Sequence, residues 1–208
     1  MIAVLDYGIG NLRSAEKALQ HVGADARLVA DPDDAMTADG VVLPGVGAFG
    51  ACAEALRRSG LDGVVRAAVA GGVPFLGICV GFQLMFEGSE EDPAATGLGV
   101  FGGVVRALPE SERRPQMQWN VVRRAPGRPS RLLGPERPAA QWYYFVHSYA
   151  PVPAGDAEEA VVGWCDYGGD IVAAMEAPAV FGTQFHPEKS GPTGLALLER
   201  FAMCCRVA

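Results

Sequence analysis

The chain has 208 residues, half of them apolar, and a formal net charge of −7. This size suits one compact globular domain over residues 1–208, with two small domains as the less simple alternative. The acidic balance excludes the basic surface that nucleic-acid binding requires. No apolar run approaches the roughly 20 residues needed to cross a bilayer. Residues 2–5 are too short for a signal peptide and lack its basic flank. We therefore expect a cytoplasmic protein that binds neither nucleic acid nor a membrane.

The first half of the chain alternates short apolar runs with helical patterns. The apolar runs predict strands at residues 2–5, 26–30, 40–43 and 73–76. Apolar residues at helical spacing predict helices at 12–22, 49–58, 61–70 and 80–87. This alternation is typical of an α/β fold, with a mostly parallel sheet flanked by helices.

The second half has a different sequence pattern, because its apolar segments are short, β-prone and separated by turn residues. They predict strands at residues 100–108, 117–122, 142–149, 160–164, 171–175 and 180–185. Loops are predicted at 89–93, 110–115 and 125–138, and a closing helix at 193–205. We expect this half to add an antiparallel layer to the parallel sheet.

Cys79 occupies the corner between the fourth predicted strand and the helix that follows it. It lies between Gly77 and Gly81. The pattern Gly-x-Cys-x-Gly has the spacing of a nucleophile elbow, in which small residues let the backbone fold back and expose one side chain. The start of a helix also favours the thiolate. Cys79 is therefore the predicted nucleophile.

No pattern in the sequence predicts a metal or a cofactor. The five cysteines are odd in number and irregularly spaced, which predicts neither a disulfide framework nor a Cys-x-x-Cys metal site. Gly8 and Gly10 invite comparison with a dinucleotide-binding loop, but Arg13 stands where the third glycine of that motif belongs. We therefore expect neither a cofactor nor a metal.

A thiol nucleophile needs a neighbouring base, and the chain offers three histidines. His186 follows the strand predicted at 180–185, at the end of a sheet where α/β folds gather ligand-binding residues. Glu188 shares a face with His186 in an extended chain, so its carboxylate can fix the tautomer of the ring. His21, near the end of the first helix, is predicted to be a solvated surface residue. His147, in an aromatic strand without an adjacent acid, is the weaker candidate for the base.

Thiol attack on an amide or ester creates an oxyanion that needs two hydrogen-bond donors. Elbow geometry offers the amide of Val80, the residue after the nucleophile. The second donor is predicted within residues 44–47, Pro-Gly-Val-Gly, because their glycines let an N–H turn toward a developing charge. The alternative for this segment is a plain turn between a strand and a helix.

The chain resembles the class I, or triad, glutamine amidotransferases, and within them the glutaminase subunits of imidazole glycerol phosphate synthases, from histidine biosynthesis. The resemblance covers essentially the whole chain. It implies a flavodoxin-like arrangement of the central sheet and its helices. The segments that carry it are residues 6–14, 44–49, 77–83, 145–149 and 182–191.

The resemblance implies that Cys79 attacks the side-chain amide of L-glutamine, that His186 transfers the proton and that Glu188 orients the ring. Ammonia then leaves, and water releases glutamate from a thioester. The substrate pocket implied by the family pattern contains Gly45, Gln83, Ser148 and Tyr149. The implied oxyanion hole is formed by the amides of Val46 and Val80, with Val46 brought into place by a local rearrangement that couples this activity to a partner.

The implied partner is a (β/α)8-barrel cyclase subunit that uses the ammonia and forms a heterodimer with this chain. The residues that match the contact face are Asn11, Trp119, Asn120 and Lys189. Gln118 departs from the family pattern, because the family commonly has glycine there. A side chain therefore occupies a place at this face that is often empty.

Three other functions fit parts of the same pattern. The same glutaminase chemistry would serve another acceptor in anthranilate or aminodeoxychorismate synthesis. A stand-alone cysteine hydrolase would act on an ester or a peptide without a partner. A scaffold subunit would keep the fold without catalysis, but a complete elbow and His-Glu pair have no structural need and favour an enzyme.

Overall fold

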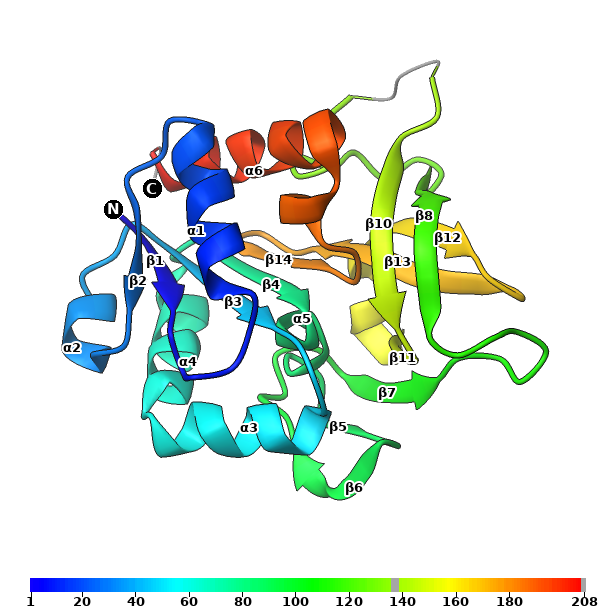
Figure 1. Ribbon diagram of the computed structural model, residues 1–208, viewed down its shortest axis with the longest axis horizontal. Helices are drawn as coiled ribbons and strands as arrows, with labels where there is room; N and C mark the ends of the chain where they lie inside the picture. Colours follow the sequence, from blue (N-terminus) through cyan, green and yellow to red (C-terminus); the bar gives the residue numbers. More distant parts are fainter. Residues whose placement is uncertain (136–138, 207–208) are drawn as a thin grey trace.

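A computed structural model describes residues 1–135 and 139–206. An eight-stranded sheet runs through its centre, as Figure 1 shows. Its strands are, in spatial order, β2 (Ala26–Val29), β1 (Ile2–Leu5), β3 (Gly40–Gly45), β4 (Phe75–Cys79), β14 (Val180–Thr183), β13 (Asp170–Glu176), β12 (Val161–Asp166) and β9 (Arg123–Arg124). The first five strands are parallel and the last three antiparallel. The predicted α/β fold with a mostly parallel sheet is confirmed.

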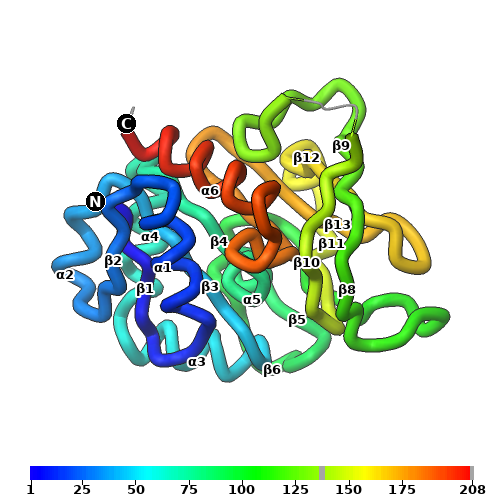
Figure 2. The backbone as a smooth tube through the Cα atoms, turned by 45° about the horizontal axis from the view of Figure 1, so that its top comes forward, coloured from blue at the N-terminus to red at the C-terminus, as the bar shows by residue number. Residues whose placement is uncertain are grey.

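Helices cover both faces of the parallel part of the sheet (Figures 1 and 2). On one face α1 (Leu12–His21) packs against α6 (Gly191–Cys205), and on the other α3 (Phe49–Arg58) packs against α4 (Leu61–Gly71). Because the sheet is covered twice, every residue of β1, β3, β4 and β14 is buried. The remaining helical segments are α2 (Pro32–Ala35), α5 (Val80–Gln83), η1 (Gly155–Ala160) and η2 (Pro187–Lys189). None of the described helices has both the length and the apolar character to span a membrane.

Two smaller sheets lie beside the central one, toward the end where β12 and β13 extend it (Figure 2). One is the antiparallel pair β8 (Gln116–Val121) and β10 (Trp142–His147). The other contains, in order, β11 (Tyr149–Pro153), β7 (Gly103–Ala107), β5 (Gly88–Ser89) and β6 (Asp92–Thr96). The added antiparallel strands are thus present, but they are divided among the central sheet and two small sheets, and β5 pairs with β7 in parallel.

The helix predicted at 80–87 is shorter in the structure and ends at Gln83. The carbonyls of Leu84, Met85 and Phe86 accept hydrogen bonds from the backbone N–H groups of residues 98–101. Those carbonyls are therefore not available to a further helical turn. The apolar residues that suggested a longer helix are buried in the core instead.

The strand predicted at 142–149 is two strands, which divide at Ser148. On one side of this residue the chain pairs with β8, and on the other side it pairs with β7. The loop predicted at 89–93 is also wrong in part, because it contains the end of β5 and the start of β6. The division at Ser148 comes from pairing with two different distant strands, whereas β5 and β6 form a local antiparallel pair that polar turn residues did not suggest.

Two loops were predicted in the second half of the chain. Residues 110–115 contain neither helix nor strand, as expected. The same holds for residues 125–135, the part of the second predicted loop that the structure describes. The rest of that predicted loop, residues 136–138, lies outside the described residues.

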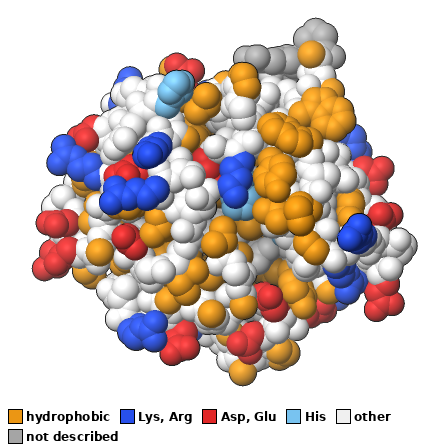
Figure 3. Space-filling model, viewed as in Figure 1, with side chains coloured by type: hydrophobic (Ala, Val, Ile, Leu, Met, Phe, Trp, Pro, Cys, Tyr) orange, Lys and Arg blue, Asp and Glu red, His pale blue; other side chains and the backbone are white. Residues whose placement is uncertain are grey.

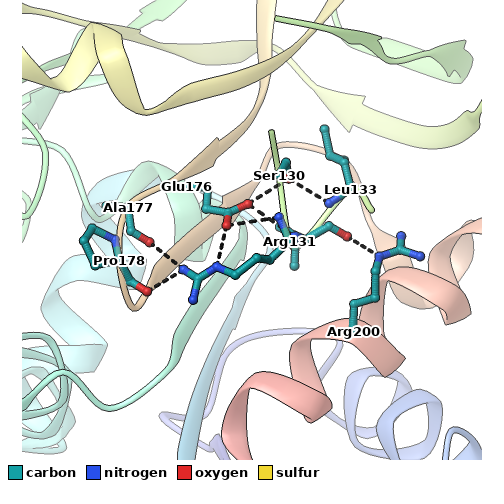
Figure 4. Close-up of polar contacts among 8 residues, drawn as sticks. Ser130, Arg131, Leu133, Glu176, Ala177, Pro178 and Arg200 are labelled. Atoms are coloured by element: carbon teal, nitrogen blue, oxygen red, sulfur yellow. Dashed lines mark hydrogen bonds and ion pairs between the residues drawn. The ribbon is translucent and has the colours of Figure 1, made fainter. Parts of the chain in front are cut away.

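Glu176, at the end of β13, holds this second loop in place (Figure 4). Its carboxylate accepts hydrogen bonds from the Ser130 hydroxyl at 2.7 Å and from Arg131 Nε at 2.9 Å. The backbone N–H groups of Arg131 and Leu132 also donate to it, both at 3.2 Å. Arg200 of α6 donates to the carbonyl of Leu132 at 2.7 Å. The loop is therefore fixed to both the central sheet and a covering helix.

Candidate active site

Cys79 stands at a sharp turn, where β4 ends and α5 begins. Its φ of 54° and ψ of −112° make it the single non-glycine residue with positive φ in the described chain. Such a conformation is strained for a residue with a side chain, and strained backbone of this kind is typical of nucleophile elbows. The turn was predicted from the glycines that flank Cys79.

Glycine is required on both sides of Cys79, because the neighbouring backbone leaves no room for a side chain at either position. A Cβ on Gly77 would lie 2.8 Å from the carbonyl oxygen of Gly81, inside van der Waals contact. A Cβ on Gly81 would lie 1.8 Å from the carbonyl oxygen of Leu43 in β3. The spacing of the motif therefore follows from how closely α5 approaches two strands of the sheet.

His186 and Glu188 form a buried pair just beyond β14. Nδ1 of His186 lies 2.7 Å from Oε1 of Glu188, and each side chain is only 2% exposed. A carboxylate can only accept at this distance, so the proton of the ring lies on Nδ1. Nε2 is left as the reactive nitrogen, and it has no hydrogen-bond partner among the described residues. This is the division of roles that a triad requires.

The pKa of His186 reports its closeness to Cys79. Burial alone lowers the pKa of this ring, but the Cys79 sulfur and the Glu188 carboxylate more than offset burial and raise it to about 10. Both neighbours favour a positively charged imidazole. The arrangement suits a sulfur that gives its proton to the ring.

A cavity of about 270 Å³ brings most of the predicted site residues together. Those on its wall are Val46, Cys79, Val80, Gln83, Ser148, Tyr149 and His186. Glu188 lies behind the ring of His186, away from the cavity wall. Gly45 is buried beneath the wall, where a Cβ would lie 2.6 Å from the backbone nitrogen of Gly81.

Residues 44–47, which contain the predicted second oxyanion donor, accept hydrogen bonds from two buried side chains. The Tyr7 hydroxyl donates to the carbonyl of Pro44 at 2.8 Å, and the Cys52 thiol donates to the carbonyl of Val46 at 3.4 Å. Burial raises the pKa of both groups, that of Cys52 to about 11, so both keep the protons that they donate. The peptide between Gly45 and Val46 is thus flanked by two anchored carbonyls.

Gln83 lies one helical turn beyond Cys79 and is buried in the wall of the cavity. Its Nε2 donates to the carbonyl of Tyr149 at 2.8 Å and to Oε1 of Gln184 at 3.1 Å. Gln184 in turn places its Nε2 3.7 Å from the sulfur of Cys79. Two amide side chains therefore connect the far wall of the cavity to the nucleophile.

Three residues of the site were missed or undervalued by sequence reasoning. Glu91 lines the cavity and accepts a hydrogen bond from the N–H of Phe49 at 2.8 Å, but it lies in a segment predicted to be a plain loop. Gln184 had a usable signal, because it lies two residues before His186 in an extended segment. His147 lines the same cavity, although it was judged only as a rival base.

His147 is poorly suited to be the base. Its Nδ1 lies 2.9 Å from the carbonyl of Tyr149, which can only accept, so the proton of the ring lies on Nδ1. Burial, together with the nearby His186, lowers the pKa of His147 to about 4. No carboxylate among the described residues pairs with it. The third histidine, His21, is exposed at the end of α1, as predicted.

None of the predicted contact residues lines the cavity, and one of them, Asn11, contacts Glu188. Asn11 donates from Nδ2 to Oε1 of Glu188 at 3.4 Å. Trp119 and Lys189 are exposed, and both lie against Tyr144, at 6.2 Å between ring centroids and 6.0 Å from Nζ to the centroid. Asn120 is half-buried and donates to the carbonyl of Asp166 at 2.8 Å.

The described residues hold no group of three or more His, Cys, Asp or Glu side chains that would bind a metal ion. The five cysteines are all unpaired thiols. The lining side chains with polar or reactive groups are those of Cys79, His147, His186, Glu91, Gln83, Ser148 and Tyr149. This set suits attack by sulfur on a carbonyl carbon, with proton transfer by a ring.

Comparison with known proteins agrees with this chemistry. The model of the class-I glutamine amidotransferase family matches residues 3–205. The chain is 46% identical to the imidazole glycerol phosphate synthase subunit HisH of Salinibacter ruber, over 97% of this chain and 94% of that protein. It is 47% identical to the protein of the same name from Mycobacterium tuberculosis, over 95% of this chain and 94% of that protein.

The fold is also similar to solved structures. A crystal structure of a glutamine amidotransferase gives a TM-score of 0.76 at 21% identity, over 99% of this chain and 98% of that chain. PurLQS from Thermotoga maritima gives 0.74 at 21% identity, over 96% of each chain. At these identities the likeness concerns the fold alone, whereas the family match and the sequence relatives span nearly the full length. The chain belongs to the class I glutamine amidotransferase family.

Proposed function

We propose that this chain is the glutaminase subunit of a two-subunit imidazole glycerol phosphate synthase, with residues 1–208 as one amidotransferase domain. One observation carries the chemistry: Cys79 and His186 line the same small cavity, and Glu188 lies behind the ring. The choice of this member of the family is supported by relatives of that name that are 42–47% identical over nearly the whole chain.

In the first half-reaction Cys79 attacks the carbonyl carbon of the side-chain amide of glutamine. The thiol proton passes to Nε2 of His186, while Glu188 holds the proton on Nδ1 and so orients the ring. A C–S bond forms and the C–N bond breaks. The ring gives its proton to the departing nitrogen, which leaves as ammonia, and a glutamyl thioester remains on Cys79.

In the second half-reaction a water molecule attacks the thioester. His186 accepts a proton from this water and returns it to the sulfur as the C–S bond breaks. Glutamate leaves and the thiol of Cys79 is restored. The net reaction converts glutamine and water to glutamate and ammonia.

The walls of the cavity offer partners for the rest of the substrate. Glu91 is the one acid among the described lining residues, and its charge suits the α-ammonium group of glutamine. The backbone at Ser148 and Tyr149 supplies polar groups for the α-carboxylate. Gln83 fixes the position of Tyr149 through its carbonyl.

The oxyanion hole is proposed to consist of the amides of Val80 and Val46. Val80 follows the nucleophile at the start of α5, where its N–H is free of helical bonding. Val46 lies across the cavity in the segment anchored by Tyr7 and Cys52. Gly45 lets this segment approach the elbow closely.

The ammonia acceptor is proposed to lie on a (β/α)8-barrel cyclase subunit that forms a heterodimer with this chain. The face proposed to bind it contains Asn11, Trp119, Asn120 and Lys189. Figure 3 shows hydrophobic side chains gathered over β8 and β10 on this side of the molecule. Asn11 contacts Glu188, so partner binding on this face acts next to the triad.

The experiment that tests this function measures glutamate release from glutamine by the chain alone, with the cyclase subunit, and with the cyclase and its nucleotide ligand. We expect a large stimulation by the partner and its ligand, and no activity in Cys79→Ala. Cys205→Ala is the matched control, because its buried thiol donates to the Phe201 carbonyl far from the cavity. Equal rates with and without the cyclase, or stimulation by a chorismate-using subunit instead, would contradict the proposal.

A further inference from the structure

Gln184 is completely buried between β14 and the triad, and the proposed reaction leaves it without a role. Its backbone N–H donates to the Ala173 carbonyl at 2.9 Å, which fixes the residue beside β13. Both ends of its side-chain amide have partners. Oε1 accepts from Gln83 at 3.1 Å, and Nε2 lies 3.7 Å from the sulfur of Cys79.

The orientation of this amide follows from a chain of obligatory partners. The carbonyl of Tyr149 can only accept a hydrogen bond, so Gln83 must turn its Nε2 toward it. The same Nε2 faces Gln184, which must therefore present its oxygen. The nitrogen of Gln184 is left on the other side, where it faces Cys79. A flipped amide would break the contact with Gln83 and would point an oxygen lone pair at the sulfur.

Gln184 and His186 approach the sulfur from the same short segment. Residues two apart in an extended chain share a face, and Phe185 between them turns away to stack on Tyr143, with 4.0 Å between ring centroids. The sulfur thus meets two different nitrogens. His186 offers Nε2, which can exchange a proton with the sulfur, whereas Gln184 offers an N–H that can only donate.

We infer that Gln184 stabilises the thiolate of Cys79 by donating a hydrogen bond from Nε2 to the sulfur. This inference rests on the proposed function, in which Cys79 is the nucleophile. A hydrogen bond to an ionised acceptor is about twice as strong as one between neutral groups, and it gains further strength where water is excluded. The neutral amide supplies this stabilisation without competing for the proton that His186 must carry.

The test measures how fast iodoacetamide alkylates Cys79, with the modified residue identified by peptide mass spectrometry. Gln184→Met keeps the length of the side chain and removes the donor. We expect its alkylation rate near pH 7 to fall about tenfold, because a hydrogen bond to a charged group is lost. The rates of the variant and of the unaltered chain should converge as the pH is raised, because the thiol then ionises in both.

Two further variants separate donation to the sulfur from a merely structural effect. Thr183→Val removes a neighbouring, equally buried hydroxyl that donates to the Phe185 carbonyl, and its alkylation rate should stay unchanged. Gln83→Leu removes the partner that orients the Gln184 amide but leaves the donor itself, so it should lose less of the alkylation rate than Gln184→Met. If Gln184→Met does not fold, Gln184→Leu takes its place, with circular dichroism as the check on folding.

An alkylation rate within about twofold of the unaltered chain in Gln184→Met would overturn the inference. An equal loss in Gln83→Leu and Gln184→Met would also overturn it, because the effect would then come from the link between the two amides. Alkylation needs neither glutamine nor the cyclase. Failure of the glutaminase assay would therefore count against the proposed function, whereas the alkylation rates would still show whether Gln184 stabilises the thiolate.

Discussion

Two histidines share the cavity with Cys79, and their surroundings move their pKa values in opposite directions. The pKa of His186 rises to about 10, because the sulfur and Glu188 outweigh burial. The pKa of His147 falls to about 4, because burial dominates and only a carbonyl faces its Nδ1. One ring is thus suited to carry a proton, and the other stays neutral.

The neutral His147 predicts a pH dependence of stability. Its ordinary pKa of about 6.5 in the unfolded chain lies above its value in the folded chain. The unfolded state therefore binds a proton first as the pH falls, and stability present above pH 6.5 is lost toward pH 4. For a shift of this size the loss between about pH 7.5 and pH 5 is about 2 kcal/mol.

The comparison that isolates this effect uses His147→Asn, since an asparagine N–H can still donate toward the Tyr149 carbonyl. The free energy of unfolding is measured in urea at several pH values for both chains. We expect the unaltered chain to lose about 2 kcal/mol more than the variant over that range. Parallel curves for the two chains would show that His147 titrates normally in the folded state.

At this scale the sequence predicted what depends on neighbours along the chain. Cys79 was found from flanking glycines, and His186 with Glu188 from a spacing of two in an extended segment. Glu91 was missed because its place on the cavity wall depends on its bond to the N–H of Phe49, across the chain. The link from Gln83 to Gln184 joins residues 101 positions apart, which no local pattern contains.

Among the elements, the loop over residues 125–135 shows how an irregular segment is fixed by one buried carboxylate. Glu176 accepts four hydrogen bonds from this loop, two of them from backbone N–H groups that a turn would leave without partners. Its ion pair with Arg131 is a further contact, and that arginine lies over the ring of Phe181 at 5.0 Å. Loss of the charge therefore weakens several contacts together.

We expect Glu176→Gln to destabilise the chain by about 1–3 kcal/mol, because a buried charged acceptor is lost while its donors remain. Urea unfolding measures the change, and trypsin cleavage after Arg131 should become faster as the loop opens more often. Glu54→Gln is the control. Its partner Arg58 lies 3.6 Å away and both side chains are largely exposed, so the effect should stay within about 0.5 kcal/mol. Equal effects of the two substitutions would contradict this account of the loop.

Helices and strands were predictable from the sequence where the periodicity of apolar residues matches the face that is buried in the structure. The buried strands of the parallel sheet and the four long helices were found close to their observed bounds, because each has a continuous apolar run or one apolar face. Ser148 was not recognisable as a boundary, since it separates two β-prone segments that pair with different strands. The shortening of α5 likewise depends on residues 98–101, which bond to the carbonyls that follow α5 and lie too far along the chain for a local pattern to include them.

At the scale of the whole molecule, the buried pair of His186 and Glu188 lies beside an exposed apolar face. Met117, Trp119 and Trp142 on β8 and β10 are each about half exposed or more. Figure 3 shows hydrophobic side chains gathered over these two strands, and apolar patches of this kind often mark interaction sites. Tyr144 of the same sheet accepts a hydrogen bond from the backbone N–H of His186 at 2.9 Å. The face and the reactive ring are thus joined through a single residue.

We expect the apolar face on β8 and β10, rather than the cavity, to determine whether the chain binds the proposed cyclase subunit. Trp119→Ala should weaken this binding by about 2 kcal/mol or more, since a tryptophan that becomes buried in an interface often contributes much of the binding energy. It should leave the melting temperature of the isolated chain nearly unchanged, because its ring is half exposed there. Calorimetric titration and thermal unfolding measure the two quantities. Met36→Ala, a similarly exposed apolar residue beyond α2, should change neither, and unaltered cyclase binding by the Trp119 variant would remove this face from the interface.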